Sequence, residues 1–281
     1  MNPQKGTIKK RLALFVLTYL ESYGIICCNV FFGRNIIMGL EVALIIVGIL
    51  IAIVGMVSGV TSLWLIIKYY RFNRRENSLG LTGMQIARKI LDDNGLQDIE
   101  VKRTGSFLFG NSYSHYFKKV RLRGFIRHET SLTSIGMGAQ KASLAILDKE
   151  GDPDMQKRIR LVPLITFGPF AFIPLLLIGG LLDFFIFNGS GICTTVLGVL
   201  GFFFYGYSIV LSVMTLKTEK KAQEIAYDIL EGYHITDEEL SAIKELFHLY
   251  NVQYVNDIIL ASLELIYRVL EIVIALKSKA D

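Results

Sequence analysis

The sequence has few of the residues that build disulfide frameworks, metal sites and nucleophilic catalytic sites. It contains three cysteines and four histidines in 281 residues, with no C-x-x-C and no paired Cys/His spacing. The cysteines, Cys27, Cys28 and Cys193, lie within or beside apolar runs and predict neither a disulfide framework nor a metal site. The sequence also lacks G-x-S-x-G and Gly-rich phosphate loops, which argues against serine hydrolases of that type and P-loop nucleotide binding.

The four histidines do not pair with other metal-ligating residues along the chain. They are His115, His128, His234 and His248, and none has a second histidine or cysteine at ligand spacing. His128-Glu129 comes just before a predicted helix, but Thr130-Ser131 is typical of a helix entry and leaves the pair in a loop. We therefore predict that His128 is a solvated loop residue.

The sequence also has a low share of charged residues and contains several long apolar runs. Charged residues make up 20% of the sequence and hydrophobic residues 52%, and the mean hydropathy is +0.45. The run 42–67 has no charge and exceeds the roughly 20 residues that cross a bilayer. The runs 161–187, with three prolines, and 191–216 are joined by a short turn and predict a helical hairpin. The sequence therefore predicts an α-helical integral membrane protein.

The flanks of the apolar runs predict the orientation in the membrane. The run 12–32 is apolar but carries Glu21, and we predict that it is a first span. Basic residues next to the spans lie at 9–11, 68–75, 157–160 and 217–221, whereas 183–191 has no lysine or arginine. Because cytoplasmic flanks are enriched in Lys and Arg, four spans place both termini and the soluble regions in the cytoplasm. The net charge of +5 then reflects anchoring beside lipid headgroups and argues against nucleic acid as a partner.

Two soluble regions contain clear helix signals. Thr82-Gly83-Met84-Gln85 forms a capping box that predicts a helix over 83–93, and alternating apolar residues at 99–102 and 119–123 predict two strands. A second capping box at 236–239 predicts a helix to about 250. The following segment, 252–276, carries too many charges to span, so we expect it to lie on the domain or membrane surface. We divide the chain into an N-terminal anchor (1–41), a transmembrane helix (42–69), a soluble α+β region (70–160), a helical hairpin (161–216) and a soluble helical region (217–281).

Four sequence blocks and the hairpin carry a resemblance to a known family. The blocks are SLGLTGMQIARKILDDNGLQDIEV at 78–101, SIGMGAQKASLAIL at 134–147, VMTLKTEKKAQEIA at 213–226 and ITDEEL at 235–240. In order and spacing they resemble the YugP-type bacterial membrane-bound neutral zinc metallopeptidases, over about 58–270. The resemblance implies a cytoplasmic α+β zincin-like domain, with the C-terminal region packed against it.

The resemblance also implies where a zinc site would fall. In the family, the block that aligns with Ile135 to Ala145 reads approximately IG-x-A-A-H-E-A-G-H-A. The two zinc-ligating histidines then fall on Gln140 and Leu144, the catalytic glutamate on Lys141, and the third ligand on Glu219. The family's Asp-His-Tyr-Asp and Glu-Phe-Asp stretches appear here as Asn111-Ser112-Tyr113-Ser114 and Glu219-Lys220-Lys221.

These replacements predict that the zinc site is lost. Leu144 has no lone pair, Gln140 offers only an amide oxygen, and Lys141 places a cation where zinc would sit. We therefore expect no zinc cofactor and no peptidase activity, because no metal-bound water and no general base remain. The small and apolar positions of the same helix fit a packing face: Ile135, Gly136, Ala139, Ala142 and Ala145. We expect the helix to persist.

Two interpretations of Glu219 stay open. In the first, its carboxylate balances the neighbouring lysines of a Thr-Glu-Lys-Lys run at the membrane edge. Alternatively, it forms an ion pair with Lys141 inside the former cleft, which would preserve the helix packing without metal. In that case Gln140, Lys141 and Glu219 form a polar cluster that is available for binding.

The favoured hypothesis is a pseudopeptidase that binds or scaffolds a protein partner at the membrane. The partner would be a membrane or cytoplasmic protein, such as an active paralogue, and an extended peptide would add to the sheet edge. A second hypothesis is a membrane metallopeptidase with residual or altered hydrolysis. A third is a membrane-structural or transport subunit. Its signals are the hairpin glycines Gly198, Gly201 and Gly206 for helix packing and the acidic residues Glu21, Glu41 and Asp183 for transport.

Overall fold

The structure is a computed structural model that describes residues 4–104, 110–165, 168–189 and 191–277, without the side chains of 4–37, 162–173 and 275–276. Its elements are α1 (Gln4–Asn73), α2 (Gly83–Asp93), β1 (Glu100–Arg103), β2 (Ser112–Ser114), β3 (Lys119–Leu122), α3 (Gly124–His128), α4 (Leu132–Lys149), α5 (Pro153–Ile165), α6 (Gly168–Phe185), α7 (Ile192–Gly232) and α8 (Asp237–Lys277). The chain divides into two units. One comprises Met1–Ala52 with Leu263–Asp281, and the other comprises Ile53–Ser262.

The N-terminal helix α1 is continuous over 70 residues. Within the described residues, Met38–Asn73 and Ile192–Gly232 are long and apolar enough to cross a membrane, judged by length and composition, and Pro174–Phe185 is a shorter apolar helix. The two predicted spans, 12–32 and 42–67, both fall within α1. The segment between them contains no proline, so nothing interrupts the backbone hydrogen bonds. That 12–32 crosses a bilayer stays a prediction, and Glu21 lies outside the described side chains.

The helices α6 and α7, which lie where the sequence predicts a helical hairpin, pack against each other. At Gly179 an added Cβ would lie 2.7 Å from Thr194 Cα, so the two backbones approach closely. The buried carboxylate of Asp183 accepts hydrogen bonds from the backbone N–H groups of Cys193 (3.0 Å) and Thr194 (2.7 Å) and caps α7. Gly198 lies against Leu176, which places it in an intramolecular contact. The first helix of the hairpin, predicted over 161–187, is instead divided between the end of α5 and α6.

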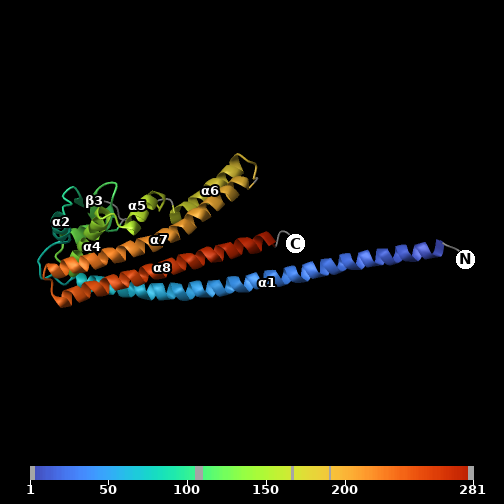
Figure 1. The fold of residues 1–281 in the computed structure, drawn as a ribbon, viewed down its shortest axis with the longest axis horizontal. Coiled ribbons are helices and arrows are strands. Elements are labelled where there is room, and N and C mark those ends of the chain that lie inside the picture. Colours follow the sequence, from blue (N-terminus) through green and yellow to red (C-terminus); the bar gives the residue numbers. More distant parts are fainter. Residues whose placement is uncertain (1–3, 105–109, 166–167, 190, 278–281) are drawn as a thin grey trace. The chain divides into compact units, whose positions relative to one another are not determined.

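The soluble region begins with α2, which forms over the predicted residues. Thr82 accepts a hydrogen bond from the N–H of Gln85, and the Gln85 side chain accepts one from the N–H of Thr82, which completes the capping box. Ile86, Ala87, Ile90 and Leu91 are fully buried and form the apolar face. Figure 1 shows α2, β3 and α4 gathered beside one end of α7, with α6 beside the other end.

A three-stranded sheet in the order β1-β3-β2 covers this region. Strands β1 and β3 are parallel and confirm the two predicted strands, while β2 pairs antiparallel with β3. The strand β2 was not predicted, because three polar and aromatic residues show no alternation that indicates a strand. Helix α3 also differs from the prediction: His128 ends a short helix and is exposed, and Glu129 is its C-cap, so the pair does not lie in a loop.

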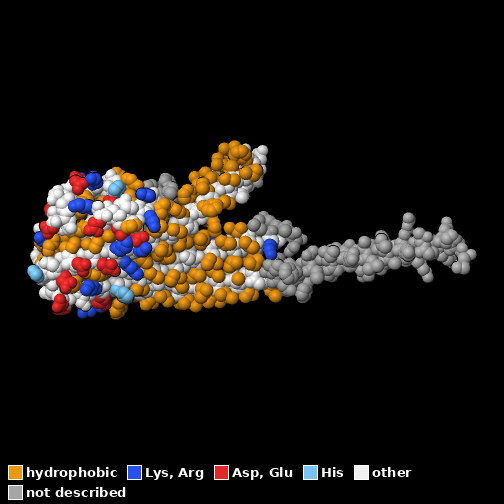
Figure 2. Space-filling view, viewed as in Figure 1, with side chains coloured by type: hydrophobic (Ala, Val, Ile, Leu, Met, Phe, Trp, Pro, Cys, Tyr) orange, Lys and Arg blue, Asp and Glu red, His pale blue; other side chains and the backbone are white. Residues whose placement is uncertain are grey.

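The predicted helix end near 250 is wrong, and the predicted region boundary at 216 lies inside a continuous helix. Helix α7 continues to Gly232, and α8 is a single helix from Asp237 to Lys277. The first part of α8 completes the core: Phe247 is fully buried, and Ile243 lies where a side chain at Gly136 would stand. Figure 2 shows charged side chains gathered where the soluble region lies and hydrophobic side chains covering the helices beyond it.

Candidate polar binding site

Helix α4 is the central element of the candidate site. Ser131 caps its N-terminus by accepting a hydrogen bond from the N–H of Ser134 at 3.1 Å. The predicted packing positions are all buried: Ile135, Gly136, Ala139, Ala142 and Ala145. Every residue from Leu132 to Leu147 is buried as well, so α4 has no solvent-facing side over this length. The sequence predicts one packing face on α4, whereas the structure buries all of its faces because other elements surround it.

Lys141 and Glu219 form an ion pair between α4 and α7. Lys141 Nζ lies 2.7 Å from Glu219 Oε2, and the two side chains are 10% and 16% exposed. Arg158 of α5 binds the other carboxylate oxygen at 3.2 Å and donates a second hydrogen bond to Thr218 Oγ1 at 2.7 Å. Of the two interpretations of Glu219, the geometry corresponds to the one that places it opposite Lys141, and Arg158 is a second cation beside it.

The charge state of Glu219 follows from its surroundings. Burial raises the pKa of this carboxyl, but the neighbouring Lys141 and Arg158 outweigh burial, and the pKa is lowered below its usual value. Glu219 is therefore ionised at neutral pH, and the cluster consists of two cations and one carboxylate.

A polar pocket with a cavity volume of about 360 Å³ opens above this cluster. Its lining combines residues from α1, the ends of β2 and β3, α4, α7 and α8: Tyr69, Gly110, Asn111, Arg123, Met137, Gln140, Lys141, Thr215, Leu216, Glu219, Gln223, Tyr250, Asn251 and Tyr254. Gln223 and Asn251 join α7 to α8 by two reciprocal amide hydrogen bonds of 3.1 and 2.8 Å. The predicted cluster of Gln140, Lys141 and Glu219 therefore lies together in one pocket.

Leu144 does not belong to this pocket. It is 1% exposed and packs in a separate apolar cluster with Leu147, Met155, Ile159 and Ala222. The residues at the aligned positions do not fit a zinc ion. Leu144 has no atom that can bind a metal, and the carboxylate of Glu219 is already in an ion pair with the ammonium of Lys141. In the described part of the chain, no three His, Cys, Asp or Glu residues lie close enough to hold a metal. The loss of zinc stays a prediction.

Lys220 and Lys221 follow Glu219 but do not enter the pocket lining. Lys221 pairs with Asp152 and with Asp154 (2.8 Å), which ties α7 to the start of α5. Lys220 has no predicted role beyond the alignment. Of the stretch 111–114, Asn111 lines the pocket and its side-chain oxygen accepts a hydrogen bond from the N–H of Arg123 at 2.8 Å.

Several residues of the site were not predicted from the sequence, because no local pattern indicates them. Arg123, Arg158 and the three tyrosines come from separate elements, and only the folded chain brings them together. A further polar group lies on Asp148, whose carboxylate accepts from Tyr113 Oη at 2.6 Å and contacts His115 Nδ1 at 2.6 Å. That group joins β2 to α4. The capping signal at Ser131 located α4 in the sequence, but no local pattern indicates which loops cover it.

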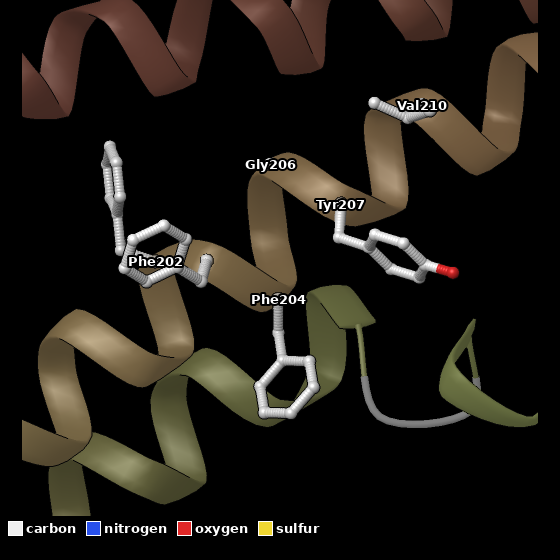
Figure 3. A pocket seen from close by; sticks show the side chains of 6 residues that line it. Phe202, Phe204, Gly206, Tyr207 and Val210 are labelled. Atoms are coloured by element: carbon white, nitrogen blue, oxygen red, sulfur yellow. The ribbon is translucent and has the colours of Figure 1, made fainter. Parts of the chain in front are cut away.

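A second cavity lies along α7 and has the opposite character. Its volume is about 460 Å³, and one helix supplies all its described lining residues: Phe202, Phe203, Phe204, Gly206, Tyr207 and Val210. Figure 3 shows the rings of Phe202, Phe204 and Tyr207 extending from α7. Among these described lining residues, the hydroxyl of Tyr207 is the one polar side-chain group, so this part of the lining suits hydrocarbon.

Comparisons with known proteins support the resemblance inferred from the sequence. The profile of a family described as "Putative neutral zinc metallopeptidase" matches residues 44–273. The "Putative membrane protease YugP" of Bacillus subtilis (strain 168) is 28% identical over 180 residues, which cover 63% of this chain and 75% of that protein. No solved structure matches the chain significantly.

These comparisons contradict one prediction from the sequence. The expectation that the chain is not an enzyme is wrong, because the matching family and the Bacillus relative are both described as peptidases. That expectation rested on the chemistry of three positions, whereas the family match extends over most of the chain. The comparisons and the two apolar helices agree on a membrane location.

Proposed function

The chain belongs to the neutral zinc metallopeptidase family, and we propose that its polar pocket binds a segment of a polypeptide at the membrane. A polypeptide is the class of molecule that a peptidase acts on. The soluble region is proposed to lie in the cytoplasm, where its basic flanks follow the spans. The partner is a membrane or cytoplasmic protein that presents an extended segment.

The observation that carries this proposal is the position of the pocket at the end of the sheet. Asn111 precedes β2 and Arg123 follows β3, and both line the pocket. Among the strands that the structure describes, β2 pairs only with β3 and is an edge strand. An extended segment that adds to an open strand edge gains main-chain hydrogen bonds, and its side chains reach an adjacent pocket.

Binding is tested with the full-length protein in lipid nanodiscs and a fluorescein-labelled peptide of alternating valine and serine. Fluorescence anisotropy should show saturable binding, and Gln140→Leu should weaken it because the amide lies in the pocket lining. Gln97→Leu is the matched control, since Gln97 is an exposed residue outside the pocket. Equal binding by both variants, or no binding by the unmodified protein, would refute the proposal.

Hydrolysis is the second candidate function, because the family and the relative carry that description. An H-E-x-x-H zinc site does not explain hydrolysis here, because the residues at its positions are Gln140, Lys141 and Leu144. Mass spectrometry of the same peptide after incubation, with and without added zinc, measures cleavage directly. Stoichiometric zinc in the purified protein that disappears in Glu219→Ala would establish an altered metal site.

A further inference from the structure

The polar pocket carries more positive than negative charge. Glu219 is the acidic residue of its described lining, and it is already bound by Lys141 at 2.7 Å and by Arg158 at 3.2 Å. Two cations facing one carboxylate leave the cluster with one positive charge. Arg123, which lines the pocket from the end of β3, contributes a second positive charge. A negatively charged group of a ligand is therefore favoured in this pocket.

Two polar side chains of the pocket have no partner within the part of the chain that the structure describes. Gln140 is only 5% exposed, yet its side-chain amide makes no hydrogen bond to another described residue. The guanidinium of Arg123 forms neither an ion pair nor a hydrogen bond there, although its backbone N–H is bound by Asn111. Among the described residues, the amide atoms of Gln140 are not in the set of fully buried polar atoms without a partner, so they are accessible from the pocket and free to hydrogen-bond to a ligand there.

The remaining lining residues supply hydroxyl groups that can donate. Burial raises the pKa of Tyr250 to about 12, against the opposite effect of Arg123, so the phenol stays protonated at neutral pH. Tyr69 and Tyr254 line the same pocket. A guanidinium, an amide and phenol hydroxyls together form a set of hydrogen-bond donors that suits a planar anion.

We propose that the pocket recognises a carboxylate of the bound polypeptide, and that the side chains of Arg123 and Gln140 donate hydrogen bonds to it. The inference rests on the proposed function and names the class of segment that is bound. The carboxylate comes either from an Asp or Glu side chain or from the C-terminus of the partner. Arginine suits this role because its planar fork matches the geometry of a carboxylate, in contrast to the point charge of a lysine.

Three labelled peptides test the inference on the full-length protein in phosphatidylcholine nanodiscs. The first is the valine and serine peptide with one central Glu and an amidated C-terminus, the second carries Gln in its place, and the third carries Gln and a free C-terminus. At least one acidic peptide should bind about tenfold more tightly than the neutral peptide, as expected for one charge-assisted pair. Whichever acidic peptide gains affinity identifies the source of the carboxylate.

Arg123→Gln should weaken binding of the acidic peptide about tenfold more than binding of the neutral peptide, and so remove the preference between them. Arg121→Gln is the matched control, since Arg121 lies two residues earlier on β3 and outside the described pocket lining. Gln140→Leu should reduce the preference in the same direction as Arg123→Gln.

The outcomes separate this inference from the proposed function. Equal affinity for all three peptides would overturn the carboxylate inference while the proposed function stands. Absence of binding by every peptide would overturn both. Arg123-dependent binding to phosphatidylglycerol vesicles, with no preference among the peptides, would overturn the inference in favour of a lipid headgroup.

Discussion

In helix α4, polar side chains are buried, whereas in the first part of α7, apolar side chains are exposed, which is the opposite of what each composition suggests. In α4, Thr133, Ser134, Gln140, Lys141 and Ser143 are all buried, although each is polar. In the apolar part of α7, by contrast, Val196 is 61% exposed and Phe203 is 70% exposed. The polar helix is thus inside the protein, and the apolar helix is largely on its surface.

The comparison shows that two different environments select these residues. In α4, the buried hydroxyl groups find partners within the fold, as Ser143 Oγ does by donating to the carbonyl of Ala139 at 2.9 Å. On α7 the exposed apolar side chains suit a surrounding hydrocarbon layer, where burial inside the protein is not needed. Stability of the soluble region should therefore depend on α4 and its neighbours, and membrane association on the exposed apolar surface.

The largest expected effect comes from removing a core aromatic ring. Phe247→Ala should destabilise the protein by about 3–5 kcal/mol, because the fully buried ring would leave a cavity in the core. Phe203→Ala removes the same ring from an exposed position of α7 and should change stability far less. Denaturant unfolding of both variants in detergent measures the difference, and equal losses would contradict the comparison.

The next effect comes from the charge cluster on α4. Glu219→Gln should cost about 3 kcal/mol, because it leaves the ammonium of Lys141 and the guanidinium of Arg158 close together without their carboxylate. Lys141→Met should cost less, since Arg158 still pairs with Glu219. Both values follow from chemical denaturation of the protein in detergent.

The double variant Lys141→Met/Glu219→Gln tests whether the two residues interact. Coupled residues give a combined loss that differs from the sum of the single losses by about 0.5–3 kcal/mol. Strictly additive losses would show that the ion pair contributes nothing to stability.

A smaller loss is expected where the start of α2 contacts α3 and α4. A Cβ added at Gly83 would lie 2.1 Å from the carbonyl oxygen of Ile126 and 2.9 Å from that of Ser134. Gly83→Ala should therefore cost about 1–3 kcal/mol, the usual range for overpacking. Gly59→Ala on α1 meets no atom within 4 Å and should cause no loss. A thermal shift assay on both variants measures this, and equal midpoints would show that the close contact does not constrain the fold.

The smallest effect is a dependence of stability on pH. The folded-state pKa of Glu219 is lowered, so its stabilising contribution is fully present above the unfolded pKa of about 4.3 and is lost as the pH falls through the folded value. The stability difference between the unmodified protein and Glu219→Gln should therefore shrink below about pH 4. Unfolding midpoints measured across this range test it, and a constant difference would show that Glu219 does not titrate there.

Local signals predict the well-marked elements of the fold. The capping box at Thr82 predicts α2 over the residues where it forms, and Ser131 predicts the start of α4. The alternation at 99–102 and 119–123 predicts β1 and β3. Elements without such signals are missed: β2 has only three residues, and no local signal indicates that α7 continues to Gly232 or that α8 continues to Lys277.

The candidate site was predicted in part. Aligned positions indicate Gln140, Lys141 and Glu219, and the structure joins them in one pocket, but Leu144 lies in a separate apolar cluster. Arg123 and Arg158 are missed because they come from β3 and α5, and no local spacing relates them to Glu219. The position of a side chain relative to distant elements is a property of the whole fold.

The sequence by itself determined the membrane location, the family and the residue types at the aligned positions, because these depend on hydrophobic run length and on residue order. Only the tertiary structure decided that α4 is buried on all sides, that Lys141 shares Glu219 with Arg158, and that Arg123 completes a positively charged pocket. The physical reason is that burial and the electrostatic field at a site are set by residues far apart in the chain, which become neighbours only after folding.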